Sequence, residues 1–191
     1  MKVLLIGSGG REHALAWKLR QSPFLSKLYV APGNAGMAEL AECVSIGAEE
    51  IDDLIQFARE KEIDLTVVGP EAPLVAGIVD GFQQEGLKIF GPSRAAAQIE
   101  GSKIFAKELM VRAGVPTAEF KIFDKAADAK HYLVESEPPF VIKADGLAAG
   151  KGVEVVDTCE EAVDVITRFM ERESLGAAGR RVLVEERLEG E

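Results

Sequence analysis

The chain has 191 residues, of which 47% are hydrophobic and 28% charged, and its formal net charge is −10. This composition is typical of a globular protein with a real core, and the acidity opposes nucleic-acid binding, which needs a basic face. No apolar run approaches the roughly 18 residues of a membrane span. Cys43 and Cys159 are too far apart in sequence to predict a disulfide or a thiolate metal site. We therefore expect a cytoplasmic protein with neither a nucleic-acid nor a membrane partner.

In the first part of the chain, short apolar runs alternate with helical patterns. The pattern predicts strands at 3–6, 28–31, 44–46, 65–68 and 88–90, and helices at 11–21, 50–61 and 73–85. Such alternation indicates an α/β unit, in which right-handed crossovers build a parallel sheet covered by helices on both faces.

After the Gly-Pro-Ser sequence at 91–93 the alternation of strands and helices stops, and two helices are predicted in succession. Helices are predicted at 94–99 and 102–113, followed by strands at 118–123, 140–143, 153–156 and 181–186. Asp124 is expected to cap a helix between the first two of these strands. Thr158 and Glu161 form a capping box that should open a helix running to about 171.

The first glycine-rich segment, GSGGREH at 7–13, lies where the first strand turns into the first helix. Backbone amides at a helix N-terminus, with few side chains around them, favour an anion. A dinucleotide site would want Gly or Ala in place of Glu12 and an acidic residue at the end of the second strand, where 30–32 read Val-Ala-Pro. A phosphorylated small molecule therefore fits better than NAD. The alternative is that the glycines only make a tight turn.

Two further loops, PGNAG at 32–36 and GPEAPL at 69–74, also follow predicted strands. Ligands bind at the carboxyl edge of open α/β sheets, so we expect the three loops to form one site. Glu71 would suit ribose hydroxyls, although an acidic residue also fits a helix N-terminus for electrostatic reasons. His13 is interpreted as a helix-surface histidine and not as a catalytic group.

The segment VIKADGLAAGKGV at 141–153 places Lys143 at the end of an apolar strand and Lys151 in a flexible glycine-rich loop. It is not a P-loop, because the spacing differs and a strand follows. A glycine-rich flap between strands can cover a triphosphate while a strand lysine pairs with its phosphates. The alternatives are a structural ion pair for Lys143 and a solvated charge for Lys151. The segment 181–188 could hold adenine through its backbone and ribose through a carboxylate.

Taken together, GSGGREHA, PGNAG, GPEAPL, FGPS, EGSK, VIKADGLAAGKG and VEERLEGE resemble the phosphoribosylamine–glycine ligase (glycinamide ribonucleotide synthetase) family of the ATP-grasp superfamily. The resemblance runs in the same order along the whole chain. It implies a Rossmann-like pre-ATP-grasp domain at 1–100, a connecting helical segment at 101–120, and the first (A) subdomain of a truncated ATP-grasp fold at 121–191.

The resemblance also implies the ligands of individual residues. Phosphoribosylamine would be bound by Gly9, Gly10, Arg11, Glu12, Gly33, Asn34 and Glu71. ATP would be bound by Lys103, Lys143, Gly146, Ala149, Gly150, Lys151, Gly152, Glu185, Glu186, Leu188 and Glu191, with Lys143 and Lys151 as the catalytic pair.

The implied reaction joins glycine to phosphoribosylamine at the expense of ATP, through glycyl phosphate, in purine biosynthesis. Members of the family continue for roughly as many residues again, and the Mg²⁺ or Mn²⁺ ligands are expected there and not in this chain. We therefore expect these 191 residues alone to be inactive. The oligomeric state stays open. The alternatives are another ATP-grasp ligase, such as a biotin carboxylase or a formate-dependent purine enzyme, an NAD-dependent oxidoreductase, and a non-catalytic nucleotide-binding module.

Overall fold

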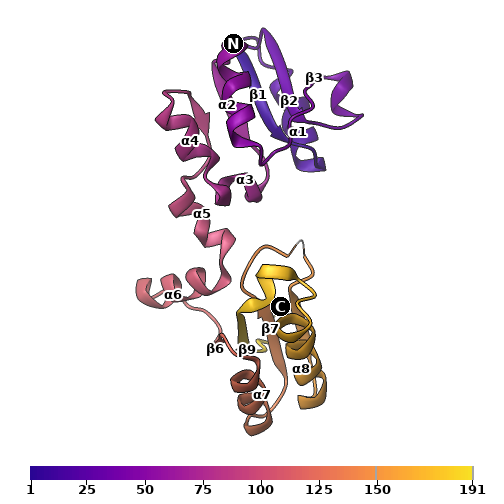
Figure 1. Ribbon diagram of the computed structural model, residues 1–191, viewed down its shortest axis with the longest axis vertical. Coiled ribbons are helices and arrows are strands. Elements are labelled where there is room, and N and C mark those ends of the chain that lie inside the picture. The colour runs from indigo at the N-terminus through magenta and orange to yellow at the C-terminus, as the bar shows by residue number, and fades with distance from the viewer. Residues whose placement is uncertain (149, 191) are drawn as a thin grey trace. The chain divides into compact units, whose positions relative to one another are not determined.

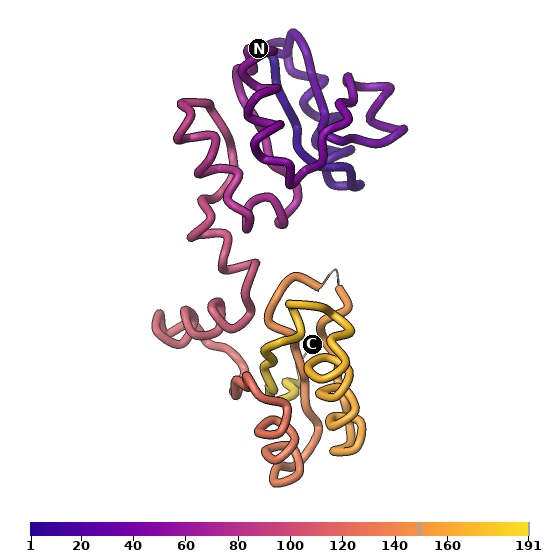
Figure 2. The backbone as a smooth tube through the Cα atoms, in the orientation of Figure 1, coloured from indigo at the N-terminus to yellow at the C-terminus, as the bar shows by residue number. Residues whose placement is uncertain are grey.

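The computed structural model describes residues 1–148 and 150–190 and contains two compact units, Met1–Ala97 and Gln98–Glu191 (Figure 1). The chain leaves the first unit through helix α5, Arg94–Gly101, and continues into α6, Lys103–Ala113 (Figure 2). No helix in the described part of the chain is both long and apolar enough to span a bilayer.

The first unit contains a five-stranded sheet in the order β3-β2-β1-β4-β5, and every neighbouring pair is parallel. Its strands are β1 Lys2–Gly7, β2 Lys27–Pro32, β3 Glu42–Cys43, β4 Leu65–Val68 and β5 Ile89–Phe90. The connecting helices are α1 Gly10–Leu19, the short η1 Met37–Glu39, α2 Ile51–Glu60, α3 Glu71–Ala76 and α4 Ile78–Gln84. The predicted parallel α/β sheet is confirmed.

The central strand β1 is buried on both faces, which explains its uninterrupted apolar sequence. Leu4 and Ile6 pack in a cluster with residues of α2 and α4. Val3 and Leu5 pack in another cluster, which includes Ala16 of α1. Successive side chains of a strand point to opposite faces, so these two clusters are the two covered faces of the sheet.

Three local predictions were wrong. The helix expected at 73–85 is two helices, because Gly77 between them has a φ of +99° that only glycine adopts easily. The third strand is Glu42–Cys43, and Val44 and Ile46 instead pack against the core beside it. Helix α7, Ala126–Glu135, begins one residue too late for Asp124 to cap it, and Lys125 occupies the cap position.

The second unit contains a four-stranded sheet in the order β6-β9-β7-β8, with every pair antiparallel. The strands are β6 Phe120–Phe123, β7 Phe140–Ala144, β8 Val153–Val156 and β9 Val182–Glu186. The helical segments after α6 are α7, α8 Cys159–Ile166, the π-helical η2 Thr167–Glu171 and the short η3 Gly176–Arg180. The capping box of Thr158 and Glu161 is confirmed, since the threonine hydroxyl accepts from the Glu161 amide at 3.2 Å.

The two faces of this second sheet differ. One face carries Phe140, Ile142 and Val184 and is covered by α7 and α8. The register places Val141 opposite Glu185 and Lys143 opposite Leu183, so these four side chains share the other face. We call this the lysine face. The sequence pattern of β7 therefore buries one row of residues and leaves Lys143 on the side available for a ligand.

Candidate functional site

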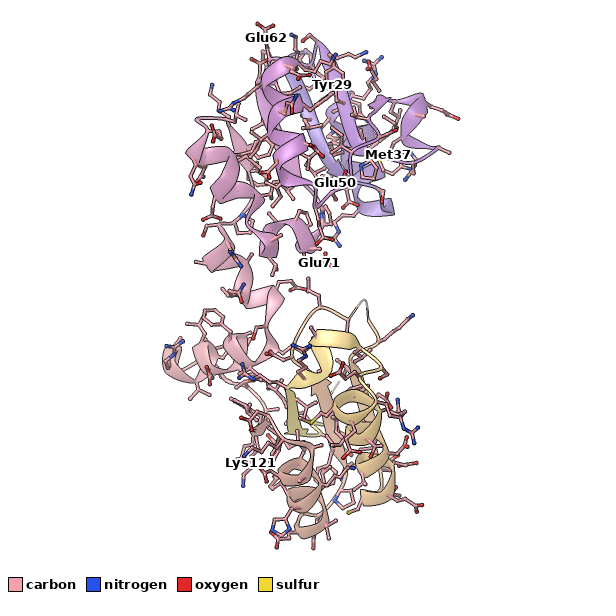
Figure 3. The ribbon with its side chains drawn as sticks, viewed as in Figure 1. Tyr29, Met37, Glu50, Glu62, Glu71 and Lys121 are labelled. Carbon is pink, nitrogen blue, oxygen red and sulfur yellow. The ribbon has the colours of Figure 1, made fainter. Side chains whose placement is uncertain are left out.

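The structure brings the three predicted loops of the first unit together at the carboxyl edge of its sheet. The Gly33 amide donates to the Gly7 carbonyl at 3.1 Å, and Asn34 Nδ2 donates to the Ser8 carbonyl at 2.8 Å. Arg11 Nη1 donates to the Gly69 carbonyl at 3.0 Å, which ties the loop after β1 to the loop after β4. In Figure 3, Glu71 lies at the end of this unit opposite to Glu62.

Glu12 is buried inside the first turn, with only 4% of its surface exposed. Its Oε2 accepts from the Gly9 amide at 2.8 Å, while its Oε1 has no hydrogen-bond partner among the described residues and lies 3.8 Å from Arg11 Nε. A Cβ added to Gly7 or Gly69 would lie 2.5 or 2.3 Å from Glu12 Cγ, so both glycines make room for this side chain. The glutamate that departs from the dinucleotide pattern thus holds the turn together from within.

The amides of Gly10 and Arg11 at the start of α1 remain free of protein partners in the described part of the chain. No heavy atom lies within 4 Å of a Cβ added to Gly10, so the space beside this turn is open. The Arg11 side chain is 64% exposed, and its guanidinium pairs with Glu71 across 3.5 Å. Free amides, a helix N-terminus and an arginine favour an anion here, with the Glu71 carboxylate beside it.

In the second unit, Asp145 connects α6 to the glycine-rich loop. Its Oδ1 accepts from Ser102 Oγ at 2.7 Å and from the Ile104 amide at 2.9 Å. Lys103 Nζ donates to the Gly146 carbonyl at 3.1 Å, so the predicted lysine at the helix start lies against the predicted loop. Sequence reasoning missed Asp145, although its position between an apolar strand and a glycine was a usable signal.

Lys103 and Lys143 both lie at the base of the glycine-rich loop, because the Lys103 amide donates to the Asp145 carbonyl at 3.0 Å and Lys143 precedes Asp145 by two residues. Burial lowers the pKa of the Lys103 ammonium and Lys143 lowers it further, while the carboxylates of Asp145 and Glu100 raise it. The net direction is downward, because removing a cation from water disfavours its charged form. The structure therefore gathers two predicted lysines around one end of the glycine loop.

The Lys143 ammonium donates to Glu185 Oε2 at 2.7 Å. The same oxygen lies 3.1 Å from the ammonium of Lys107, a residue of α6. Glu185 is 3% exposed, whereas 26% of the Lys143 side chain is exposed. The ion pair that was one alternative for Lys143 thus exists, but it leaves the ammonium partly open to solvent. Lys107 was not predicted from the sequence, although it lies one helical turn after Lys103.

The other predicted ATP residues differ in their surroundings. Lys151 and Gly150 are exposed, and Gly150 has a φ of +80°. Glu186 Oε1 accepts from the Glu119 amide at 2.9 Å, and Leu188 is 65% exposed. Gly146 and Gly152 lie at the two ends of the loop, where an added Cβ would contact Ala178 or Ala148. Ala149 and Glu191 lie outside the described residues.

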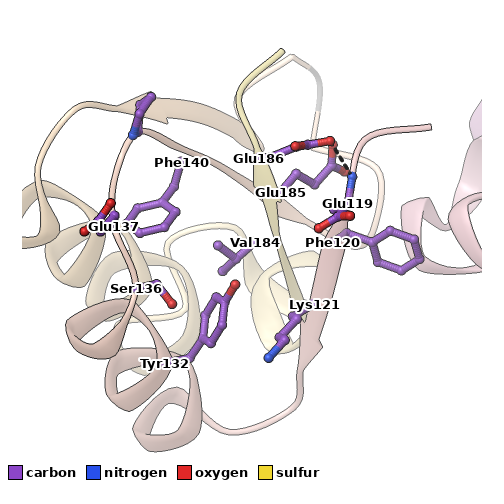
Figure 4. Close-up of a pocket in the computed structure, with 11 residues that line it drawn as sticks. Glu119, Phe120, Lys121, Tyr132, Ser136, Glu137, Phe140, Val184, Glu185 and Glu186 are labelled. Carbon is purple, nitrogen blue, oxygen red and sulfur yellow. Dashed lines mark hydrogen bonds between the residues drawn. The ribbon is translucent and has the colours of Figure 1, made fainter.

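A cavity of about 320 Å³ opens at the ends of β6, β7 and β9 (Figure 4). Its lining includes Tyr132 and Ser136 of the α7 region together with Phe140 and Val184, whose side chains belong to the face covered by helices. Lys103, Lys107 and Lys143 are not among its lining residues. Glu185 of the lysine face does line the cavity, so the two regions adjoin at the end of β9 without sharing Lys143.

Within residues 1–148 and 150–190, no three His, Cys, Asp or Glu side chains come together as a possible metal site. The described residues thus do not by themselves fit a divalent metal. The arrangements of lysines, amides and carboxylates reported above do not depend on one.

Both parts of the chain match known protein families. Residues 1–100 match the family model described as phosphoribosylglycinamide synthetase, N domain, and residues 101–191 match its ATP-grasp (A) domain. The chain belongs to the phosphoribosylglycinamide synthetase family. The resemblance inferred from the motifs is thereby confirmed, as is the fold class of an α/β domain followed by an ATP-grasp A domain.

Relatives from this family cover the whole chain. The phosphoribosylamine–glycine ligases of Brucella melitensis and Halalkalibacterium halodurans are 58% and 53% identical over 191 residues. The crystal structure of the Thermotoga maritima ligase superposes with a TM-score of 0.80 at 29% identity. The chain spans 44% and 45% of the two relatives and 45% of that structure, less than half of their length.

The fold is also shared beyond the family. The biotin carboxylase domain of a Hydrogenobacter thermophilus 2-oxoglutarate carboxylase covers 98% of the chain with a TM-score of 0.77. Its sequence is only 20% identical, so this likeness concerns the fold alone.

Proposed function

We propose that this chain provides the phosphoribosylamine site and part of the ATP site of a phosphoribosylamine–glycine ligase. The observation that carries the proposal is the convergence of Lys103 and Lys143 at the base of the glycine-rich loop in the second unit. Two cations and a flexible loop at the end of a sheet suit a polyphosphate, and the match to an ATP-grasp (A) domain favours ATP.

ATP is proposed to bind along the lysine face. Lys143 and Lys103 would bind its phosphates, and the loop with Lys151 would cover them. Val153 and Val155 pair directly with Lys143 and Val141, so they share this face, and they are 44% and 56% exposed. An exposed apolar strip next to a lysine suits an adenine base beside its phosphates. Glu186 and Leu188, at the end of β9, would lie near the base and the ribose.

Phosphoribosylamine is proposed to bind at the carboxyl edge of the first sheet. The amides of Gly10 and Arg11 would hold its phosphate, and Asn34 and Glu71 would hold its ribose hydroxyls. Glu12 would contribute indirectly, because its buried carboxylate fixes the Gly9 amide and so shapes the turn.

The proposed reaction follows from the poor electrophilicity of a carboxylate. ATP transfers its terminal phosphoryl group to a carboxylate oxygen of glycine, which gives ADP and glycyl phosphate. The amine of phosphoribosylamine then attacks the carbonyl carbon, the C–O bond to phosphate breaks, and the amine loses a proton. The lysines neutralise charge in the first step, and positioning supplies much of the rate in both steps.

The first unit is tested by replacing Gly10 with aspartate. The substitution suits the N-terminus of α1, since an acidic residue there favours the helix, but it puts a negative charge where the phosphate is proposed. The wild-type chain should be stabilised by ribose 5-phosphate, and we expect Gly10→Asp to lose at least about tenfold in affinity for it. Thermal shift at increasing ribose 5-phosphate measures this.

NAD serves as the matched ligand in the same experiment. Stabilisation by NAD with no response to ribose 5-phosphate would favour the oxidoreductase alternative. An equal response to ribose 5-phosphate from wild type and Gly10→Asp would remove the proposed phosphate site.

Turnover is proposed to need the part of the ligase that this chain does not match. The 191-residue chain with ATP, glycine and phosphoribosylamine is expected to release no ADP in a coupled assay. A chimaera with the unmatched part of the Brucella melitensis relative should release ADP steadily. Steady turnover by the chain alone would contradict this proposal, and an inactive, folded chimaera would favour a non-catalytic nucleotide-binding module.

A further inference from the structure

Lys107 is a buried cation whose hydrogen bonds are all made within the protein. It is 9% exposed, and its ammonium lies 2.7 Å from Thr117 Oγ1, 3.3 Å from the Ala118 carbonyl and 3.1 Å from Glu185 Oε2. Two of its three N–H donors go to Thr117 and Ala118, and Glu185 is its ion-pair partner. Lys107 is therefore held by groups of the protein itself and is largely shielded from a ligand.

Glu185 joins Lys107 to the lysine that faces the ligand. Its Oε2 lies 3.1 Å from the Lys107 ammonium and 2.7 Å from that of Lys143. Its Oε1 is buried and has no partner in the described part of the chain. Two cations thus share one carboxylate, and the three groups together carry a single net positive charge. Among the described residues Lys143 donates only to Glu185, which leaves its other N–H donors available.

We propose that Lys107 is a positioning residue that offsets the charge of Glu185 and so leaves Lys143 electrostatically positive toward a nucleotide phosphate. The inference rests on the proposed function, because it takes the lysine face as the ATP site. Without Lys107, Lys143 and Glu185 would form a neutral pair. A neutral pair attracts a polyphosphate far less than a net cation does, and the difference is large where burial limits solvent screening.

The test is a series of charge variants in the whole 191-residue chain, with ATP affinity measured by titration calorimetry. Lys107→Met keeps the length of the side chain but removes its charge, and should weaken ATP binding by about tenfold or more. Combining it with Glu185→Gln returns the cluster to one positive charge. The double variant should therefore recover to within about threefold of wild type.

A purely structural role for Lys107 gives the opposite result, since a second core substitution would weaken binding further. Lys107→Arg, which keeps the charge, should bind ATP like wild type. Glu185→Gln alone leaves two positive charges and should bind ATP more tightly than wild type. If circular dichroism shows that Lys107→Met does not fold, the ATP affinity of Glu185→Gln tests the inference by itself.

Equal ATP affinity of wild type and folded Lys107→Met would overturn the inference but leave the proposed function standing. The same holds if the double variant binds no better than Lys107→Met, or if Glu185→Gln binds no better than wild type. Absence of ATP binding by both the wild-type chain and the folded chimaera would overturn the proposed function, and this inference with it.

Discussion

Replacement of Lys143 by alanine is expected to reduce turnover of the active chimaera by about a thousandfold or more, because it removes a positive charge from the proposed phosphate site. The substitution should leave the fold intact. Glu185 would keep its contact with Lys107 at 3.1 Å, so no buried carboxylate is left without a cation. ADP release under saturating substrates measures the effect, and circular dichroism verifies the fold.

Lys121→Ala is the matched control. Lys121 pairs with Val184 across the β6–β9 ladder, so its side chain lies on the opposite side of the same sheet from Lys143. It contacts the Tyr132 ring at 4.5 Å and has no proposed role in the reaction. Its loss should leave ADP release near that of the parent. Near-normal turnover of Lys143→Ala would refute the phosphate-binding role of this lysine.

Replacement of Asp145 by alanine is expected to lower the free energy of unfolding of the second unit by about 3 kcal/mol, because two donors lose their acceptor in a largely buried setting. The side chain is 16% exposed, and its Oδ1 holds both Ser102 Oγ and the Ile104 amide. The start of α6 would lose its two hydrogen bonds to the first residue of the glycine-rich loop. Lys103 would then lose its fixed position, so ATP affinity should fall together with stability.

Urea unfolding of the isolated chain measures this change, with Asp157→Ala as the control. The Asp157 side chain is 75% exposed and pairs only with Arg187 among the described residues. Surface pairs of this kind contribute about 0–1 kcal/mol. Asp145→Asn keeps an acceptor oxygen and should retain most of the stability. If Asp145→Ala lowers the free energy of unfolding no more than Asp157→Ala does, the hydrogen bonds from Asp145 to α6 contribute little to stability.

Periodicity predicted most elements of the first unit because the physical cause is local. A parallel strand covered on both faces is mostly apolar, as β1 is from Val3 to Ile6 and β4 is apart from the buried Thr66. The split between α3 and α4 was missed because the helical pattern continues on both sides of Gly77. Its left-handed conformation depends on how the two helices pack, which one glycine in a sequence does not reveal.

The candidate site likewise has a part that sequence rules predict and a part that they do not. Gly10, Asn34 and Glu71 follow predicted strands, and the rule that parallel strands end at one edge is sufficient to place them together. Lys143 could be placed at the end of a strand from its apolar neighbours. Neither rule gives the partner of Lys143, since Lys107 and Glu185 are brought to it by separate segments of the chain.

The sequence by itself determined the order of elements, the two glycine-rich turns and the family, because these depend on neighbours along the chain. Only the tertiary structure decided which charges meet. It placed the Glu12 carboxylate inside the first turn and shared Glu185 between two lysines. Burial makes such charges require partners, and the identity of the partner depends on which segments pack together.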